Sequence, residues 1–137
     1  MAEQSPKTPQ QTSLSIHPQK EDSQGVWFVA EPKDGKLEKA SFMLAGEAQT
    51  IATKLGEESA VVLMGNQVKD LAEQFSPYGV DKAFVIEDEI LGKYTGDAYV
   101  DVLEQVAQQH KPSVILFTTT PMGNDLAPRI AARLRVG

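Results

Sequence analysis

The residues with the most chemical potential follow an apolar run near the end of the chain. After residues 114–117 come three threonines, a glycine and an asparagine, and then a helical pattern. Threonine hydroxyls, a closely approaching glycine backbone and the free N–H groups of a helix start can together hold an anion or a nucleotide. The candidate residues for such a cofactor site are Thr119, Gly123 and Asn124.

The same turn has a structural alternative. Asp125 stands near the helix start, where its carboxylate can cap the free N–H groups and would repel a phosphate. Pro128 suits a first helical turn, because its missing donor costs little there. We therefore expect structural capping by Asp125 rather than ligand binding, and nucleotide binding stays open.

All the arginines of the chain lie just beyond this turn. Arg129 and Arg133 are four residues apart and share one helix face, and Arg135 follows them. A guanidinium suits carboxylates on a partner protein, but cations near a helix C-terminus also offset the helix dipole without any partner. Arg129 and Arg133 are the predicted partner contact, with a solvated helix end as the alternative.

Two further polar segments carry weaker patterns. Residues 31–36 follow the first apolar run but lack the glycine pattern of a phosphate loop, so a solvated turn is expected there. Residues 87–89 are all acidic, and without a histidine or metal partner they predict a solvated loop rather than acid–base catalysis. We predict no catalytic residue and no metal site in this chain.

Composition narrows the functional class. The chain has no cysteine, which excludes disulfides, thiolate-bound iron–sulfur clusters, a cysteine nucleophile and a cysteine-rich zinc site. A net charge of -6 argues against a general binder of nucleic acid or anionic membranes.

Four short apolar runs are typical of strands that are covered on both faces of a sheet: residues 26–30, 60–64, 83–86 and 114–117. Helical spacing separates them, in the pattern from Leu37 to Leu55, then around residues 68–75 and 98–106. The sequence therefore predicts an α/β fold with a doubly wound, Rossmann-like parallel sheet of at least four strands.

Helix ends are marked by their own residue types. Asn66 and Thr95 stand where side-chain oxygens can cap a first turn, while Gly56, Gly79 and Pro112 mark helix ends.

The first 24 residues differ in composition from the rest. They are rich in proline, glutamine and hydroxyl residues and poor in large apolar ones, so residues 1–24 are predicted to be a disordered extension before a domain at 25–137. They have neither the apolar core of a secretion signal nor the arginines of a mitochondrial presequence, and a cytoplasmic, bacterial location is expected. No run is long enough to span a bilayer.

Several motifs resemble the N-terminal domain of the electron transfer flavoprotein alpha subunit. They are VWFVAE at 26–31, DGKL at 34–37, GEA at 46–48 and, most specifically, PMGNDLAPRIAARL at 121–134. The resemblance runs from about Gly25 to Gly137, and the domain is expected to be incomplete at its C-terminal end. It implies a fold like that of the adenine nucleotide alpha hydrolases.

The resemblance also implies a function. Family members pair with a beta subunit, carry FAD and transfer electrons from flavoprotein dehydrogenases such as acyl-CoA dehydrogenase, as in fatty acid β-oxidation, and anaerobic branches bifurcate electrons. Their FAD is held mainly by a separate C-terminal domain, which this chain does not contain. We therefore expect an electron-carrier subunit rather than a catalyst, with this domain as a heterodimer platform that binds no flavin alone.

One position departs from the family pattern, and two alternatives stay open. Position 124 is asparagine where the family motif more often has arginine. The same architecture occurs in nucleotide-binding domains that resemble universal stress proteins, although their glycine-rich turn is represented here by Gly123 alone. The chain could also be a nonfunctional truncated fragment.

Overall fold

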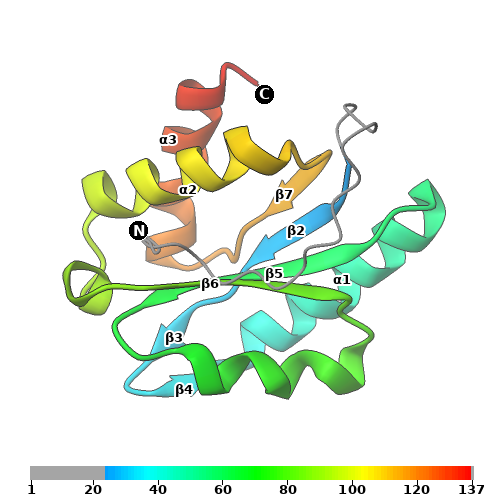
Figure 1. Cartoon of the computed structure of the whole chain (residues 1–137), viewed down its shortest axis with the longest axis horizontal. Helices are drawn as coiled ribbons and strands as arrows, with labels where there is room; N and C mark the ends of the chain where they lie inside the picture. Colours follow the sequence, from blue (N-terminus) through cyan, green and yellow to red (C-terminus); the bar gives the residue numbers. More distant parts are fainter. Residues whose placement is uncertain (1–23, 137) are drawn as a thin grey trace.

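A parallel sheet of four strands forms the middle layer of the computed structural model, which describes residues 24–136 (Figure 1). The strands are β2 (Val26–Val29), β5 (Ser59–Gly65), β6 (Lys82–Glu87) and β7 (Val114–Leu116). Their order across the sheet is β6-β5-β2-β7, and every neighbouring pair is parallel. The predicted doubly wound parallel sheet is confirmed, and each strand coincides with one of the apolar runs.

Strand β2 shows why those runs are continuously apolar. Successive side chains of a strand point to opposite faces of a sheet. Val26 and Phe28 pack into one buried cluster, while Trp27 and Val29 pack into the other. Because both faces of the sheet are covered, no position in β2 is left for a polar side chain.

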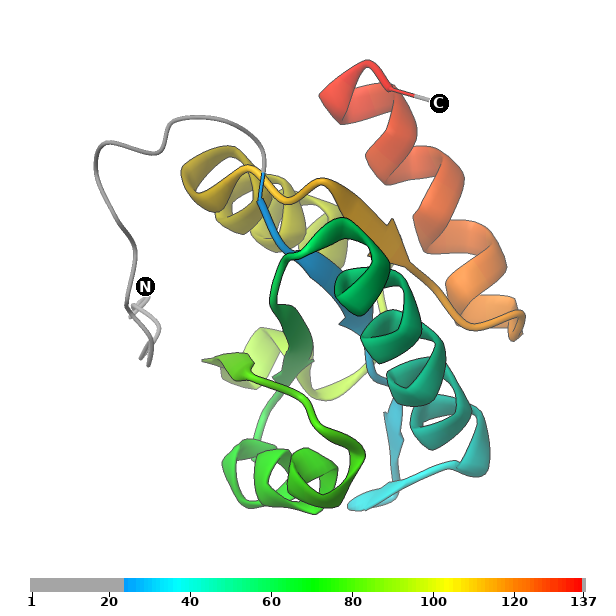
Figure 2. The same cartoon turned by 90° about the vertical axis from the view of Figure 1, so that its right-hand side faces the viewer.

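Helices cover the two faces of the sheet (Figure 2). The helix α1 (Lys39–Leu55) and the 3-10 helix η1 (Lys69–Tyr78) pack on the side of Phe28. The short η2 (Glu89–Gly92) leads into α2 (Gly96–His110), which packs with α3 (Pro121–Leu134) on the side of Trp27.

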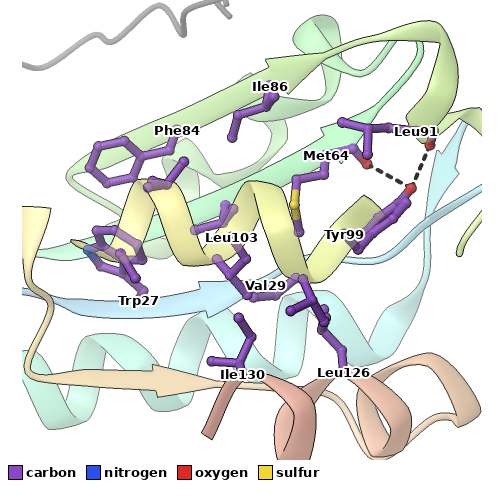
Figure 3. Close-up of a cluster of buried hydrophobic side chains, with 14 of the residues drawn as sticks. Trp27, Val29, Met64, Phe84, Ile86, Leu91, Tyr99, Leu103, Leu126 and Ile130 are labelled. Carbon is purple, nitrogen blue, oxygen red and sulfur yellow. Dashed lines mark hydrogen bonds between the residues drawn. The ribbon is translucent and has the colours of Figure 1, made fainter. Parts of the chain in front are cut away.

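Figure 3 shows the core beneath α2 and α3. The rings of Trp27 and Phe84 lie 4.7 Å apart, so Trp27 is the core residue that the sequence predicts. Leu126 and Ile130 of α3 are buried in the same cluster. The Tyr99 hydroxyl donates to the carbonyl of Leu91 at 2.5 Å, which satisfies the polar end of a buried ring.

The predicted helix ends are partly confirmed. Gly56 and Gly79 are left-handed C-caps with φ of 69° and 78°, a conformation that glycine adopts at little cost. Thr95 is the N-cap residue of α2 by position, but its side chain makes no capping hydrogen bond. Pro112 follows the left-handed C-cap Lys111 of α2, as expected of a helix stop.

The predicted cap at Asn66 is wrong. A carboxylate from the end of β6 takes this role: Glu87 Oε2 accepts from the backbone N–H groups of Val68 and Lys69, both at 2.8 Å. Asp88 caps η2 in the same way, with Oδ1 3.0 Å from the Ile90 nitrogen. The acidic run is exposed to solvent, as predicted, but two of its carboxylates also act as helix caps, because they accept from otherwise free N–H groups.

A small hairpin projects beyond β2 that the sequence analysis did not predict. Strands β3 (Pro32–Lys33) and β4 (Lys36–Leu37) pair antiparallel across Asp34 and Gly35, whose φ values are 53° and 77°. An Asp-Gly pair with both φ positive favours a two-residue hairpin turn. Leu37, assigned to the first helical pattern, therefore lies in β4, and α1 begins at Lys39.

The predicted extension lies outside the described residues, apart from Gln24. The Gln24 nitrogen donates to the Lys111 carbonyl at 2.8 Å, which ties the entry to β2 to the end of α2. Within residues 24–136, no helix combines the length and the apolar character that crossing a membrane requires.

Candidate functional site at the carboxyl ends of β2 and β7

The sheet reverses its winding direction between β2 and β7. From β2 the chain moves outward to β5 and β6, and then α2 carries it back across the sheet to β7 on the other side of β2. In open α/β sheets, ligands bind outside the carboxyl ends of the strands at this point. Two segments meet there: Glu31 follows β2, and residues 118–120 follow β7.

The Glu31 carboxylate occupies this position. Its Oε1 accepts from the hydroxyls of Thr118 at 2.8 Å and Thr120 at 2.6 Å. The two hydroxyl oxygens are 2.9 Å apart, but each hydroxyl has a single proton, so both protons can point to the carboxylate. The Glu31 nitrogen in turn donates to Oγ of the fully buried Ser41 at 2.9 Å. Glu31 is thus held by both its side chain and its backbone.

Thr120 is the N-cap residue of α3, and the prediction that Asp125 caps this helix is wrong. The Thr120 hydroxyl oxygen accepts from the Gly123 nitrogen at 3.2 Å, and Pro121 takes the first helical position, where no donor is needed. Asp125 lies too far into the helix to reach the free N–H groups. The prediction for Pro128 is also wrong, since it lies inside α3, where it has no N–H to donate to the carbonyl of residue 124.

The three cofactor candidates separate in space. Gly123 is buried, and a Cβ there would lie 1.9 Å from the Thr118 carbonyl oxygen, so the close packing of α3 on the β7 turn explains this glycine. Thr119 and Asn124 are exposed. A ligand contact by these residues stays a prediction.

Asp125 belongs to a second polar group, between α3 and the segment that precedes α2. Its Oδ2 accepts from the Tyr94 hydroxyl at 2.6 Å and from Arg129 Nε at 3.1 Å. These two donors, the tyrosine first, hold the pKa of the Asp125 carboxyl below its usual value. Burial, followed by the Asp125 carboxylate, raises the pKa of Tyr94 well above that of a free tyrosine.

The arginines join α3 to α2. Arg133 Nη1 lies 3.0 Å from Asp101 Oδ1 and 2.6 Å from Glu104 Oε1, and these carboxylates raise the pKa of the guanidinium. Arg129 Nη1 lies 3.8 Å from Asp97 Oδ1. Both arginines are therefore paired within the chain and still about half exposed, so their contact with a partner stays a prediction.

A half-buried histidine lies at the other end of the sheet. The His110 ring packs 4.8 Å from that of Phe84 and 6.2 Å from that of Trp27. Burial, and then the nearby charge of Lys82, lowers the pKa of this imidazole. In the part of the chain that the structure describes, no three histidine, aspartate or glutamate side chains gather closely enough to hold a metal ion.

The geometry favours a structural role for the switch point. The chain places its own carboxylate where an anionic ligand would bind, and a phosphate approaching α3 would meet like charge.

Comparison with protein-family models identifies the family, because residues 26–137 match the electron transfer flavoprotein domain. The chain belongs to the electron transfer flavoprotein family.

Relatives within this family share a third to two fifths of their aligned residues with the chain. Electron transfer flavoprotein subunit alpha of Thermoanaerobacterium thermosaccharolyticum is 37% identical over 85% of this chain and 35% of the relative. Protein FixB of Clostridium saccharobutylicum is 41% identical over 85% and 34%. The acryloyl-CoA reductase electron transfer subunit beta of Anaerotignum propionicum is 39% identical over 82% and 30%. The chain thus spans about a third of the length of these curated relatives.

The motif at residues 121–134, on which the sequence-based resemblance depended most, has structural roles in this chain. Within residues 121–134, Pro121 starts α3, Gly123 permits its approach to β7, and Leu126 is fully buried. Asp125 and Arg129 bind each other. Several residues of the motif therefore serve the start of α3 and its packing on the sheet.

Sequence reasoning missed two residues of this region. It treated Glu31 as part of a solvated turn, although its position directly after the first strand was a signal for the switch point. It gave Tyr94 no role, because a tyrosine before a helix has no distinctive spacing. Only the fold brings Tyr94 to Asp125, 31 residues later in the chain.

Proposed function

We propose that this chain is the N-terminal part of an electron transfer flavoprotein alpha subunit. In this role it is a platform on which a beta subunit packs during FAD-dependent electron transfer. The family match carries the proposal, since it extends over nearly all of the described α/β unit. The names of the relatives, which include alpha subunits and an electron transfer subunit of acryloyl-CoA reductase, support the same role.

The proposal assigns no cofactor to the domain itself. FAD in the intact protein would be held mainly by sequence outside these residues, and the electron donors would be flavoprotein dehydrogenases such as acyl-CoA dehydrogenase. The filled switch point supports this division, because Glu31, Thr118 and Thr120 satisfy one another at the position where a nucleotide phosphate would bind. The chain would then be colourless and redox-inactive when isolated.

Co-purification and flavin binding test this function. The tagged chain is expressed alone and together with the electron transfer flavoprotein beta subunit of the same organism. We expect the beta subunit to co-purify with the tagged chain. The chain expressed alone should show no flavin absorption after incubation with FAD and removal of free FAD. Failure to bind the beta subunit, or a stoichiometric flavin band on the isolated chain, would contradict the proposal.

A calorimetric titration with AMP and ATP tests the nucleotide-binding alternative. No heat of binding is expected for the wild-type chain. Binding that is lost in Thr120→Val would instead place a nucleotide at the switch point and favour a domain similar to universal stress proteins.

A further inference from the structure

The chain has three tyrosines, and their hydroxyl groups have different partners. Tyr78 is 42% exposed, and its hydroxyl makes no hydrogen bond among the described residues. Tyr99 is buried, and its hydroxyl donates to the carbonyl of Leu91, which is not a base (Figure 3). Tyr94 is half-buried and donates to a carboxylate oxygen, Asp125 Oδ2. In the part of the chain that the structure describes, the hydroxyl of Tyr94 is therefore the one that faces a base.

The contact between Tyr94 and Asp125 has the geometry of a proton-transfer pair. Its oxygen–oxygen distance of 2.6 Å is that of a short, charge-assisted hydrogen bond, across which a proton can move without any movement of the heavy atoms. Burial, followed by the Asp125 carboxylate, raises the pKa of Tyr94, so the phenol does not release its proton by itself near neutral pH. Loss of an electron from the ring makes the same proton strongly acidic. The electron and the proton would then leave the phenol together.

The charges around Asp125 stay balanced when this carboxylate takes up a proton. Arg129 Nε donates to the same oxygen at 3.1 Å, so protonation of Asp125 removes one opposite charge from the guanidinium. Asp97 supplies a second one, with Oδ1 3.8 Å from Arg129 Nη1. Gly96 makes room for the guanidinium, because a Cβ there would lie 2.9 Å from Arg129 Cζ. The guanidinium thus keeps a carboxylate nearby in both protonation states of Asp125.

Tyr94 also contacts the core through Tyr99. The two rings lie 4.9 Å apart, edge to face. Tyr99 in turn packs in the buried cluster that contains Met64, whose thioether is readily oxidised (Figure 3). An electron vacancy formed at Met64 or Tyr99 can therefore pass outward through packed side chains to Tyr94, where loss of the proton to Asp125 stabilises it.

We propose that Tyr94 is a redox-active tyrosine, which gives an electron to a strong one-electron oxidant, such as a peroxyl or carbonate radical, while Asp125 takes its proton. The products are a neutral tyrosyl radical, a protonated Asp125 and the reduced oxidant. A thiolate in solution then returns the electron and Asp125 returns the proton, which restores the phenol. The pair would protect Met64 and Tyr99 from oxidation, because the vacancy is held close to the surface.

This role goes beyond the proposed function and does not depend on it. A flavin is too weak an oxidant to take an electron from a phenol, so the isolated chain remains inactive in flavin chemistry.

Oxidation by photogenerated tris(bipyridine)ruthenium(III) tests the role in the 137-residue chain. We expect a tyrosyl radical in the electron paramagnetic resonance spectrum, and slower oxidation in D2O than in H2O, because the proton moves with the electron. Tyr94→Phe should remove most of the tyrosyl signal. The matched control is Tyr78→Phe, which removes an exposed tyrosine without a carboxylate partner among the described residues and should leave the signal unchanged.

Asp125→Asn separates proton transfer from a purely structural role. The asparagine oxygen can still accept from the Tyr94 hydroxyl, but it cannot take the proton. This variant should be oxidised at least about tenfold more slowly, since a positioned base commonly contributes about 10²–10⁴-fold. Its thermal midpoint reports separately on folding.

Three results would each overturn the inference. They are an unchanged tyrosyl signal in Tyr94→Phe, a wild-type oxidation rate in folded Asp125→Asn, and equal rates of wild-type oxidation in H2O and D2O. If Asp125→Asn does not fold, Tyr94→Phe and the isotope effect still decide.

Discussion

Removal of the Glu31 carboxylate measures how firmly the chain closes its own switch point. Glu31→Ala deletes the acceptor of two hydroxyl hydrogen bonds of 2.8 and 2.6 Å, and leaves the hydroxyl of the buried Thr118 without the carboxylate. A hydrogen bond to a charged group contributes about 1.5–3 kcal/mol. The two threonine hydroxyls are 2.9 Å apart and can pair with each other, which recovers part of the loss. We expect a net destabilisation of about 2–3 kcal/mol.

Equilibrium urea unfolding at pH 7, followed by fluorescence, gives this value. Glu31→Gln keeps one acceptor oxygen and should cost roughly half as much. A double-mutant cycle of Glu31→Ala with Thr118→Val should give a coupling energy of about 1 kcal/mol, because the residues are in direct contact. Glu73→Ala removes an exposed carboxylate of η1 as the control, with an expected change within about 0.5 kcal/mol. A Glu31→Ala protein as stable as this control would refute the reasoning.

Three further predictions concern packing and protonation. Gly123→Ala should lower the free energy of unfolding in urea by more than about 3 kcal/mol, because its Cβ would lie 1.9 Å from the Thr118 carbonyl oxygen. The matched control is Gly92→Ala, whose Cβ meets only an ordinary contact at 3.5 Å. Equal losses of stability in the two variants would contradict the packing argument. His110 has a lowered pKa in the folded chain, so as the pH falls below about 6.5 the imidazole is protonated in the unfolded chain before it is protonated in the folded one. The stability of the fold should therefore decline below about pH 6.5, until the pH has passed the folded-state pKa. Unfolding midpoints at several pH values check this, and the decline should be smaller in His110→Gln. Tyr94→Phe removes the donor that lowers the pKa of Asp125 most, so the carboxyl pKa measured by NMR should rise toward its ordinary value; an unchanged pKa would mean that the 2.6 Å hydrogen bond does not form in solution.

The sequence predicts the buried strands of this fold well. It predicts less well the features that depend on contacts between segments far apart in the chain. The four predicted strands are confirmed. Their apolar pattern reflects burial alone, and residues such as Val62 and Phe28 are buried whichever helix covers them. Helix caps were harder to predict. Asn66 has the right residue type, but Glu87, supplied by the next strand, reaches the N–H groups of η1. The N-cap of α3 is likewise Thr120 rather than the predicted Asp125, since Pro121 at the following position fixes where α3 begins.

The candidate site shows the same difference between local pattern and contacts between distant segments. Its location at residues 118–125 was predictable, because ligands in open α/β sheets bind where a strand opens into a helix start. Its content was not, because Glu31 contacts Thr118 from 87 residues away in the chain. The position of Glu31 directly after the first strand pointed to the switch point, but nothing local in the sequence marks its contact with Thr118.

The short strand β7 has a consequence for handling the protein. Among the described residues it pairs with β2 on one side only, and its side chains Val114, Ile115 and Leu116 are all half-buried and apolar. The opposite edge of the sheet, β6, has charged residues at both ends, Lys82 and Glu87. Charged residues on an edge strand discourage intermolecular pairing, and β7 has none. The 137-residue chain in solution is therefore expected to associate through this edge as its concentration rises, unless another polypeptide strand covers it.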